Sequence, residues 1–281
     1  MPAIINTNIA ALTAQRNTNT SQASLAISMQ RLSSGLRVNS AKDDAAGLAI
    51  SERMTAQVRG MNVAIRNAND GISMAQTAEG ALGKVGDALQ RMRELALQSR
   101  NGTNHDKDKN SLQKEFAELQ KEITRVLGGT AFNGRTILGA EATNFTFQIG
   151  ANTTADDVIE VEFENMVTEA TISAVTVTTA SIGSTADTSA IASVIDNIDK
   201  AIDTINDKRA TFGATQSRFE AVISNLQVSV ENQSAAKSRI LDADFAVETA
   251  NLSRAQILQQ AGNAMIAQAN QQPQMVLRLL Q

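Results

Sequence analysis

The sequence of 281 residues contains no cysteine, tryptophan or tyrosine, and it has only one histidine and two prolines. Without cysteine there is no disulfide framework, thiolate zinc site, iron–sulfur cluster or cysteine nucleophile. A single histidine excludes metal sites built from several, including the H-E-x-x-H pattern of metalloproteases. The formal net charge of -4 also argues against a general nucleic-acid binder, which normally carries a basic face. We therefore expect no enzyme activity, no cofactor, no bound metal and no nucleic-acid partner.

Targeting signals are equally scarce. Residues 1–6 (MPAIIN) lack the basic region and the apolar core of a signal peptide, so we expect no cleaved leader. No apolar run approaches the roughly 20 residues that a membrane-spanning helix requires, so we expect no membrane insertion. Taken alone, these features indicate a soluble, cytoplasmic protein.

Long helices are the first positive expectation. Pro2 and Pro273 lie near the two ends of the chain, so the stretch between them has no proline to break a helix. Between residues 191 and 240 apolar residues alternate at spacings of four and three, as in a coiled coil, with polar Arg209 and Gln216 interrupting the seam. The sequence predicts a mainly α fold, a long coiled-coil or bundle rod formed by paired N- and C-terminal segments. The seam residues are Ile191, Ile195, Ile198, Ile202, Ile205, Phe212, Phe219, Ile223, Leu226, Val230 and Ile240.

The helix boundaries are visible as local signals. Ser33-Ser34-Gly35 predicts the end or a bend of the first helix, and Ser40 to Asp43 has capping-box spacing for the start of the second. Asn101-Gly102 predicts the end of the second helix, and Gly128-Gly129 that of the third.

The middle of the chain has a different pattern. Alternating apolar residues at 145–149 and 159–163 predict a β-hairpin with one buried face. Residues 167–190, rich in Thr, Ser, Ala and Val, suit either a small β element or a loose surface loop. Residues 136–199 carry acids but no Lys or Arg, so we expect this region to be anionic and solvent-facing. Within it, residues 166–190 should make few packed contacts and should tolerate deletion or insertion.

Three isolated features have ordinary explanations. His105 lies in a polar turn and is expected to be a solvated loop residue. Asp242 and Asp244 lack a surrounding EF-hand loop, and the glycines near Asn133-Gly134 lack the G-K-[S/T] end of a phosphate loop. The helical stretch 90–98 brings polar groups onto neighbouring faces, which a solvated helix surface also explains.

Several runs of sequence resemble bacterial flagellin. They are INTN at 5–8, ALTAQ at 11–15, RLSSGLRVNSAKDDAAGLAI at 31–50, SRAQILQQAG at 253–262 and AQANQ at 267–271. The resemblance covers about residues 1–165 and 191–281. It departs in the middle, where a short segment replaces large outer domains, and at Leu241 and Phe245, where an acid and a tyrosine are common.

This resemblance implies a structural subunit that polymerises into the flagellar filament for swimming motility. Residues 1–44 with 242–281 would form an inner-tube helical domain, residues 45–165 with 191–241 a rod domain with the β-hairpin, and residues 166–190 a vestigial outer segment. It also implies an extracellular location, reached by type III export without a cleaved signal peptide. The polymerisation residues implied are Ile5, Ile9, Leu12, Leu25, Met29, Leu32, Val276, Leu277, Leu279 and Leu280.

The partners implied are identical subunits, the hook-associated junction and cap proteins, an export chaperone, and Toll-like receptor 5 of animal hosts. The receptor-contact residues implied by the family pattern are Gln90, Arg91, Leu95, Gln98 and Glu115. Of these, the matching arginine anchors the contact in the family.

Three alternatives stay open at this point. The hook–filament junction protein shares the terminal pattern, but occurs in few copies. An enzyme carried on a flagellin frame would need a larger insert and the absent H-E-x-x-H pattern. An unrelated coiled-coil adhesin predicts stable dimers in place of polymers.

Overall fold

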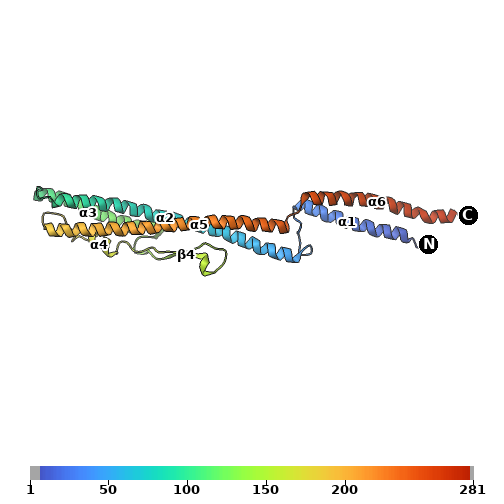
Figure 1. The fold of residues 1–281 in the computed structure, drawn as a ribbon, viewed down its shortest axis with the longest axis horizontal. Helices are drawn as coiled ribbons and strands as arrows, with labels where there is room; N and C mark the ends of the chain where they lie inside the picture. Colours follow the sequence, from blue (N-terminus) through green and yellow to red (C-terminus); the bar gives the residue numbers. More distant parts are fainter. Residues whose placement is uncertain (1–6, 279–281) are drawn as a thin grey trace. The chain divides into compact units, whose positions relative to one another are not determined.

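The computed structural model describes the backbone of residues 7–278 and the side chains of residues 7–271. The chain forms two compact units, which we call the terminal unit (residues 1–56 and 231–281) and the central unit (residues 57–230). The elements are α1 (Ile9–Ser34), α2 (Ala45–Arg100), α3 (Asp106–Gly129), β1 (Ala131–Phe132), β2 (Arg135–Thr136), β3 (Phe145–Gln148), the 3₁₀ turn Ala155–Asp157, β4 (Val158–Val161), α4 (Ala170–Thr176), α5 (Thr188–Leu241) and α6 (Phe245–Arg278). The fold is mainly helical with small antiparallel strand pairs, which confirms the predicted class (Figure 1).

In the terminal unit, α1 and α6 lie side by side and run antiparallel (Figure 1). At one end, Asn8 Nδ2 donates a hydrogen bond to the carbonyl of Ala269 at 2.8 Å. At the other, Arg31 Nη1 lies 2.9 Å from Glu248 Oε1. The N- and C-terminal segments therefore pair with each other, as the predicted fold class requires.

The first helix ends at the predicted Ser33-Ser34-Gly35. Gly35 adopts the left-handed conformation, with φ of 72°, and its N–H donates to the carbonyl of Arg31 at 2.8 Å. Beyond Gly35, the segment that connects α1 to α2 and the segment that connects α5 to α6 form a short antiparallel bridge. The N–H of Arg37 donates to the carbonyl of Leu241 at 2.6 Å, and that of Ala243 donates to the carbonyl of Gly35 at 2.9 Å.

The capping-box prediction for the second helix is wrong in its position. Asp43 Oδ2 accepts from the N–H and the hydroxyl of Ser40, at 2.9 and 3.0 Å, and so closes a separate turn. The helix begins at Ala45, where Asp44 Oδ1 accepts from the N–H of Gly47 at 2.8 Å. Two aspartates follow Ser40, and residue spacing does not decide which of them caps the helix.

The central unit is built on α2 and α5, which pair antiparallel around one hydrophobic core that also includes α3. The apolar seam of α5 is largely buried between Ile191 and Phe219. Gln216 lies in this interface and donates to Glu79 Oε2 at 2.9 Å, whereas Arg209 is exposed. The coiled-coil spacing therefore marks a real interface, with one of its two polar interruptions paired across it.

The third helix packs through Phe116, Ile123 and Leu127, which are fully buried. It begins after His105, an exposed residue whose Nδ1 accepts from the N–H of Asp106 at 3.3 Å. The predicted solvated histidine is thus confirmed, and it also caps the helix.

Two hairpins follow. The first, β1–β2, turns at Asn133 and Gly134, both with positive φ (50° and 79°), as a type I′ turn requires. The second, β3–β4, pairs Phe145 with Val161 and Phe147 with Ile159, which confirms the predicted hairpin and its inward face. The ring centroids of Phe147 and Phe219 lie 5.5 Å apart, edge to face, so the hairpin packs on α5.

Residues 166–190 differ from the loose, solvent-facing segment that we expected. Met166, Ile172, Val175 and Ile182 are buried, and α4 lies within this stretch. The expectation was wrong because the apolar residues here follow neither helical nor strand spacing over a long run, so their burial has no periodic signature.

Side chains of α2 and α3 hold this segment in place. Gln120 Nε2 donates to the carbonyls of Val175, Val177 and Ala180 at 2.7, 3.2 and 3.1 Å. Ser99 Oγ donates to the carbonyl of Ile182 at 2.5 Å. These bonds replace the strand partners that the segment lacks.

Among the described residues, no helix has the length and the apolar character that crossing a membrane would require.

Candidate functional surfaces

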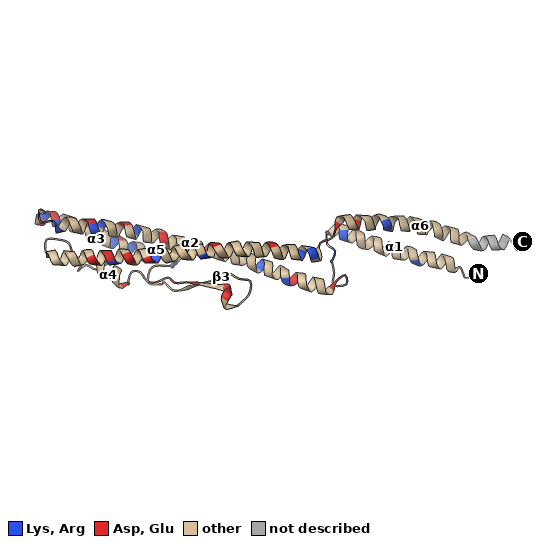
Figure 2. Ribbon diagram, viewed as in Figure 1, with Lys and Arg blue, Asp and Glu red and all other residues tan. Residues whose placement is uncertain are grey.

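Most of the strongly exposed large apolar side chains lie on α1 and α6. They are Ile9, Leu12, Ile27 and Met29 on α1, and Phe245, Val247, Ile257, Leu258 and Met265 on α6. Among the described side chains of these two helices, the buried ones are mostly small or polar: Thr18, Ser28, Glu248, Ala255 and Ala269. Figure 2 shows few charged residues along either helix. The pair therefore buries little apolar area by itself and leaves much of it in contact with water.

The predicted polymerisation residues divide accordingly. Ile9, Leu12 and Met29 are strongly exposed, at 62%, 58% and 58%, while Leu25 and Leu32 are half-buried. Ile5, and the side chains of Val276, Leu277, Leu279 and Leu280, lie outside the described residues.

Sequence reasoning missed the exposed apolar face of α6. Ile257 is 65% exposed and Met265 60%, and both lie in or near the C-terminal motif. The sequence held one signal for this face. Ile257 and Met265 lie outside the series of small residues Ala255, Gly262 and Ala269, which recurs every seven positions and faces α1.

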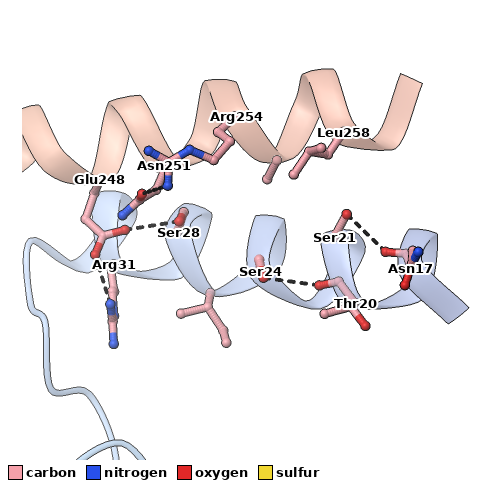
Figure 3. A pocket seen from close by; sticks show the side chains of 12 residues that line it. Asn17, Thr20, Ser21, Ser24, Ser28, Arg31, Glu248, Asn251, Arg254 and Leu258 are labelled. Atoms are coloured by element: carbon pink, nitrogen blue, oxygen red, sulfur yellow. Dashed lines mark hydrogen bonds and ion pairs between the residues drawn. The ribbon is translucent and has the colours of Figure 1, made fainter. Parts of the chain in front are cut away.

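A buried carboxylate joins the two helices. Glu248, 5% exposed, accepts from Ser28 Oγ at 3.0 Å and from Arg31 Nη1 at 2.9 Å, as Figure 3 shows. Farther along the pair, a Cβ on Gly262 would lie 2.5 Å from the Thr18 hydroxyl, so the helices approach closely there. Beside this contact the helices border an open groove of about 530 Å³, lined largely by Ser, Thr, Asn and Arg side chains.

A second surface is centred on Arg91 of α2. Its Nε lies 2.8 Å from Glu115 Oε1 on α3, and its Nη1 lies 2.8 Å from Glu94 Oε2. Hydrogen bonding to Glu115, and then to Glu94, raises the pKa of the Arg91 guanidinium above its ordinary value. About half of the Arg91 side chain is exposed (49%), so the guanidinium is oriented and still open to a partner.

The structure brings together Arg91 and Glu115, and it leaves Gln90 and Gln98 exposed. Leu95 is different, because its side chain is fully buried in the core of the central unit. Leu95 lies on the inner face of α2, one turn beyond Arg91, so its side chain presents no surface in this structure, and its receptor contact stays a prediction. Four of the five candidate receptor residues thus present surface.

The isolated sequence features have structural roles. Asp244 Oδ1 accepts from the N–H groups of Ala246 and Val247, at 2.8 and 3.2 Å, at the start of α6. Asp242 belongs to the bridge with Leu36. Within the part of the chain that the structure describes, no group of His, Cys, Asp or Glu residues could hold a metal ion.

Comparison with known proteins gives consistent matches. Residues 5–143 match the family model of the bacterial flagellin N-terminal helical region, and residues 195–280 match that of the C-terminal helical region. The chain is 47% identical to a flagellin of Halalkalibacterium halodurans over 277 residues, covering 99% of each chain. It is 43% identical to a flagellin of Bacillus subtilis, covering 98% of this chain and 99% of the relative.

A solved structure is also similar. The crystal structure of Bacillus cereus flagellin superposes with a TM-score of 0.50 at 32% identity, covering 61% of this chain and 94% of that one.

Proposed function

Since the chain belongs to the bacterial flagellin family and is a structural subunit of the extracellular flagellar filament, not an enzyme, we propose how it assembles and what recognises it. The exposed apolar faces of α1 and α6 are the polymerisation surface. The observation that supports this is their composition: small and polar side chains face inward, and large apolar ones face outward. Such helices gain stability when neighbouring subunits cover them.

We assign the domains by the same logic. Residues 1–44 with 242–281 form the inner tube, and residues 45–165 with 191–241 form the rod. Residues 166–190 stand where longer flagellins carry outer domains. In this chain they cover the rod helices, because their apolar side chains are buried there.

Seeded regrowth tests the polymerisation surface. Monomers released from filaments by heat should elongate added seeds. A variant that lacks residues 276–280 should not elongate the seeds, although its circular dichroism should show that the helices of the central unit stay folded. Leu12→Ser and Met265→Ser should also slow growth, whereas Val63→Ser, at an exposed valine of the central unit, is the matched control. Normal filaments from the truncated chain would contradict the proposal.

The same preparation separates the alternative, a hook–filament junction protein. Electron microscopy should show long filaments from this chain alone. Short rings that fail to elongate would favour the junction protein. The near-complete coverage of flagellin relatives supports the filament subunit.

Toll-like receptor 5 of animal hosts is the second proposed partner. The Arg91 guanidinium offers a fork of donors that two carboxylates already orient, and an arginine at an interface centre is a frequent hot spot. Gln90, Gln98 and Glu115 are the other exposed polar residues of this proposed surface. We propose that this surface packs against other subunits in the filament, so that the receptor binds monomers.

A receptor reporter assay on depolymerised protein tests this surface. Arg91→Ala should reduce potency by roughly thirtyfold or more. Arg125→Ala is the matched control, because Arg125 is an exposed arginine paired with Glu122 on α3. Equal signalling from wild type and Arg91→Ala would refute the site, and equal signalling from intact filaments would refute the restriction to monomers.

Export without a cleaved leader, an export chaperone, and contacts with the junction and cap proteins complete the proposed life cycle. Intact-mass measurement of filament protein should give the chain without loss of an N-terminal segment.

A further inference from the structure

Glu248 is the one acidic residue in the described helices α1 and α6, and it lies between them almost fully buried. A buried carboxylate is costly unless hydrogen bonds and an opposite charge compensate it. Ser28 and Arg31 supply both, and both come from α1. An α1–α6 pairing that separates Glu248 from these two residues would therefore leave a charge buried without compensation.

Apart from the close contact of Gly262 with Thr18, the rest of the interface discriminates weakly between registers. Along α6 the residues that face α1 recur every seven positions as Glu248, Ala255, Gly262 and Ala269. A shift of one heptad would place Ala255 or Ala269 opposite Thr18, again a small residue, but one whose Cβ would press on the Thr18 hydroxyl. The groove beside Glu248 is lined largely by polar side chains (Figure 3), and its two large apolar residues, Ile27 and Leu258, are exposed and so do not interlock the helices.

We propose that Glu248 sets the register in which α1 and α6 pair as subunits assemble, and so acts as a positioning residue for polymerisation. This inference rests on the proposed polymerisation of the terminal helices. A single buried polar pair commonly fixes register in helix pairs that apolar packing leaves ambiguous. The bond from Asn8 to the carbonyl of Ala269 does not select a side chain on α6, because every residue offers a carbonyl.

The absence of cysteine allows the register to be read by cross-linking. A Cβ on Gly262 lies 3.5 Å from the Thr18 Cβ, at the lower end of the roughly 3.5–4.5 Å range for disulfides. The double variant Thr18→Cys/Gly262→Cys therefore reports the native register. Thr18→Cys/Ala255→Cys and Thr18→Cys/Ala269→Cys report shifts of one heptad in either direction.

Each double-cysteine variant is polymerised under reducing conditions and then oxidised in the filament. The same is done with chains that also carry changes at Glu248 or Arg31. Glu248→Leu removes the carboxylate, Glu248→Gln keeps an acceptor, and Arg31→Glu/Glu248→Arg exchanges the charges. Glu231→Leu, at an exposed acid of the terminal unit, is the control.

With the native pair, and with Glu231→Leu, the Thr18–Gly262 cross-link should dominate. In Glu248→Leu the native cross-link should lose its dominance and the shifted ones should rise, while Glu248→Gln and the charge exchange should restore it. A native cross-link unchanged in Glu248→Leu filaments overturns the proposal.

If Glu248→Leu fails to form filaments, the charge exchange decides: recovery of filaments with the native cross-link supports the register role, and no recovery overturns it. Failure of the reporter chains with native Glu248 to polymerise at all would count instead against the proposed assembly surface.

Discussion

The ring of Phe219 on α5 lies against the backbone of Gly71 on α2. A Cβ at residue 71 would be 2.7 Å from Phe219 Cζ, which is closer than real Cβ contacts come. Phe147 packs edge to face on the same ring and limits its retreat. The close approach of α2 and α5 therefore depends on glycine at this position.

We predict that Gly71→Ala destabilises the central unit by about 1–3 kcal/mol, because the core must shift to admit a methyl group. Gly80→Ala is the control, since nothing lies within 4 Å of the added Cβ, and a helical glycine replaced by alanine should stabilise by roughly 0.5–1 kcal/mol. Urea unfolding followed by circular dichroism gives both values. Equal effects of the two changes would show that the ring moves freely.

Leu95→Ala should lower the free energy of unfolding by about 2–5 kcal/mol, because the side chain is fully buried. Any loss of receptor signalling by this variant should follow its unfolding. The comparison is signalling at a temperature where the variant is fully folded. Reduced signalling from the folded variant would restore a role for Leu95 at the receptor surface.

Gln120→Ala should release the segment that follows α4. Three carbonyls lose their donor, which should cost about 1–3 kcal/mol, and amide exchange in residues 175–182 should accelerate. Gln76→Ala changes an exposed glutamine of α2 and should leave exchange unaffected. For the same reason we now expect deletion of residues 166–190 to destabilise the central unit, contrary to the tolerance that the sequence suggested.

Asp43 should make the turn before α2 sensitive to acid. The N–H of Ser40, then its hydroxyl and the N–H of Asn39, bond to the carboxylate and lower the pKa of Asp43 below its ordinary value. This contribution to stability is present above the ordinary pKa of about 3.9 and is lost as the pH falls through the lowered pKa. Carbon NMR titration of the carboxyl should show the lowered pKa, and Ser40→Ala should raise it. An unchanged pKa in that variant would contradict the assignment.

The parts of this fold that follow from the sequence are those with local or periodic causes. The seam of α5, the break at Gly35 and the alternation of the β3–β4 hairpin each depend on residues close together in the chain. The start of α2 escaped because Asp43 and Asp44 compete for the same role. Asn133-Gly134 is a strong signal for a two-residue hairpin turn, but in the sequence it served only to argue against a phosphate loop, so the β1–β2 hairpin was not predicted.

The functional surfaces were less predictable because they depend on distant partners. Leu95 and Arg91 are one turn apart on α2, yet α2 contacts several elements, so its periodicity does not show which face is free. The burial of Ile182 depends on Ser99 and Gln113 from other helices, including the bond from the N–H of Ile182 to Gln113 Oε1 at 2.6 Å. In the sequence Glu248 is indistinguishable from an exposed helical glutamate, and only the structure shows that α1 buries it and supplies its hydrogen-bond partners.

The bridge between Gly35–Arg37 and Leu241–Ala243 has a mechanical consequence. The chain is non-helical from Gly35 to Arg37 and again just after Leu241, the last residue of α5, and hydrogen bonds tie the two segments to each other there. A pull along the chain is therefore shared by these two hydrogen-bonded segments, and neither segment can extend without the other.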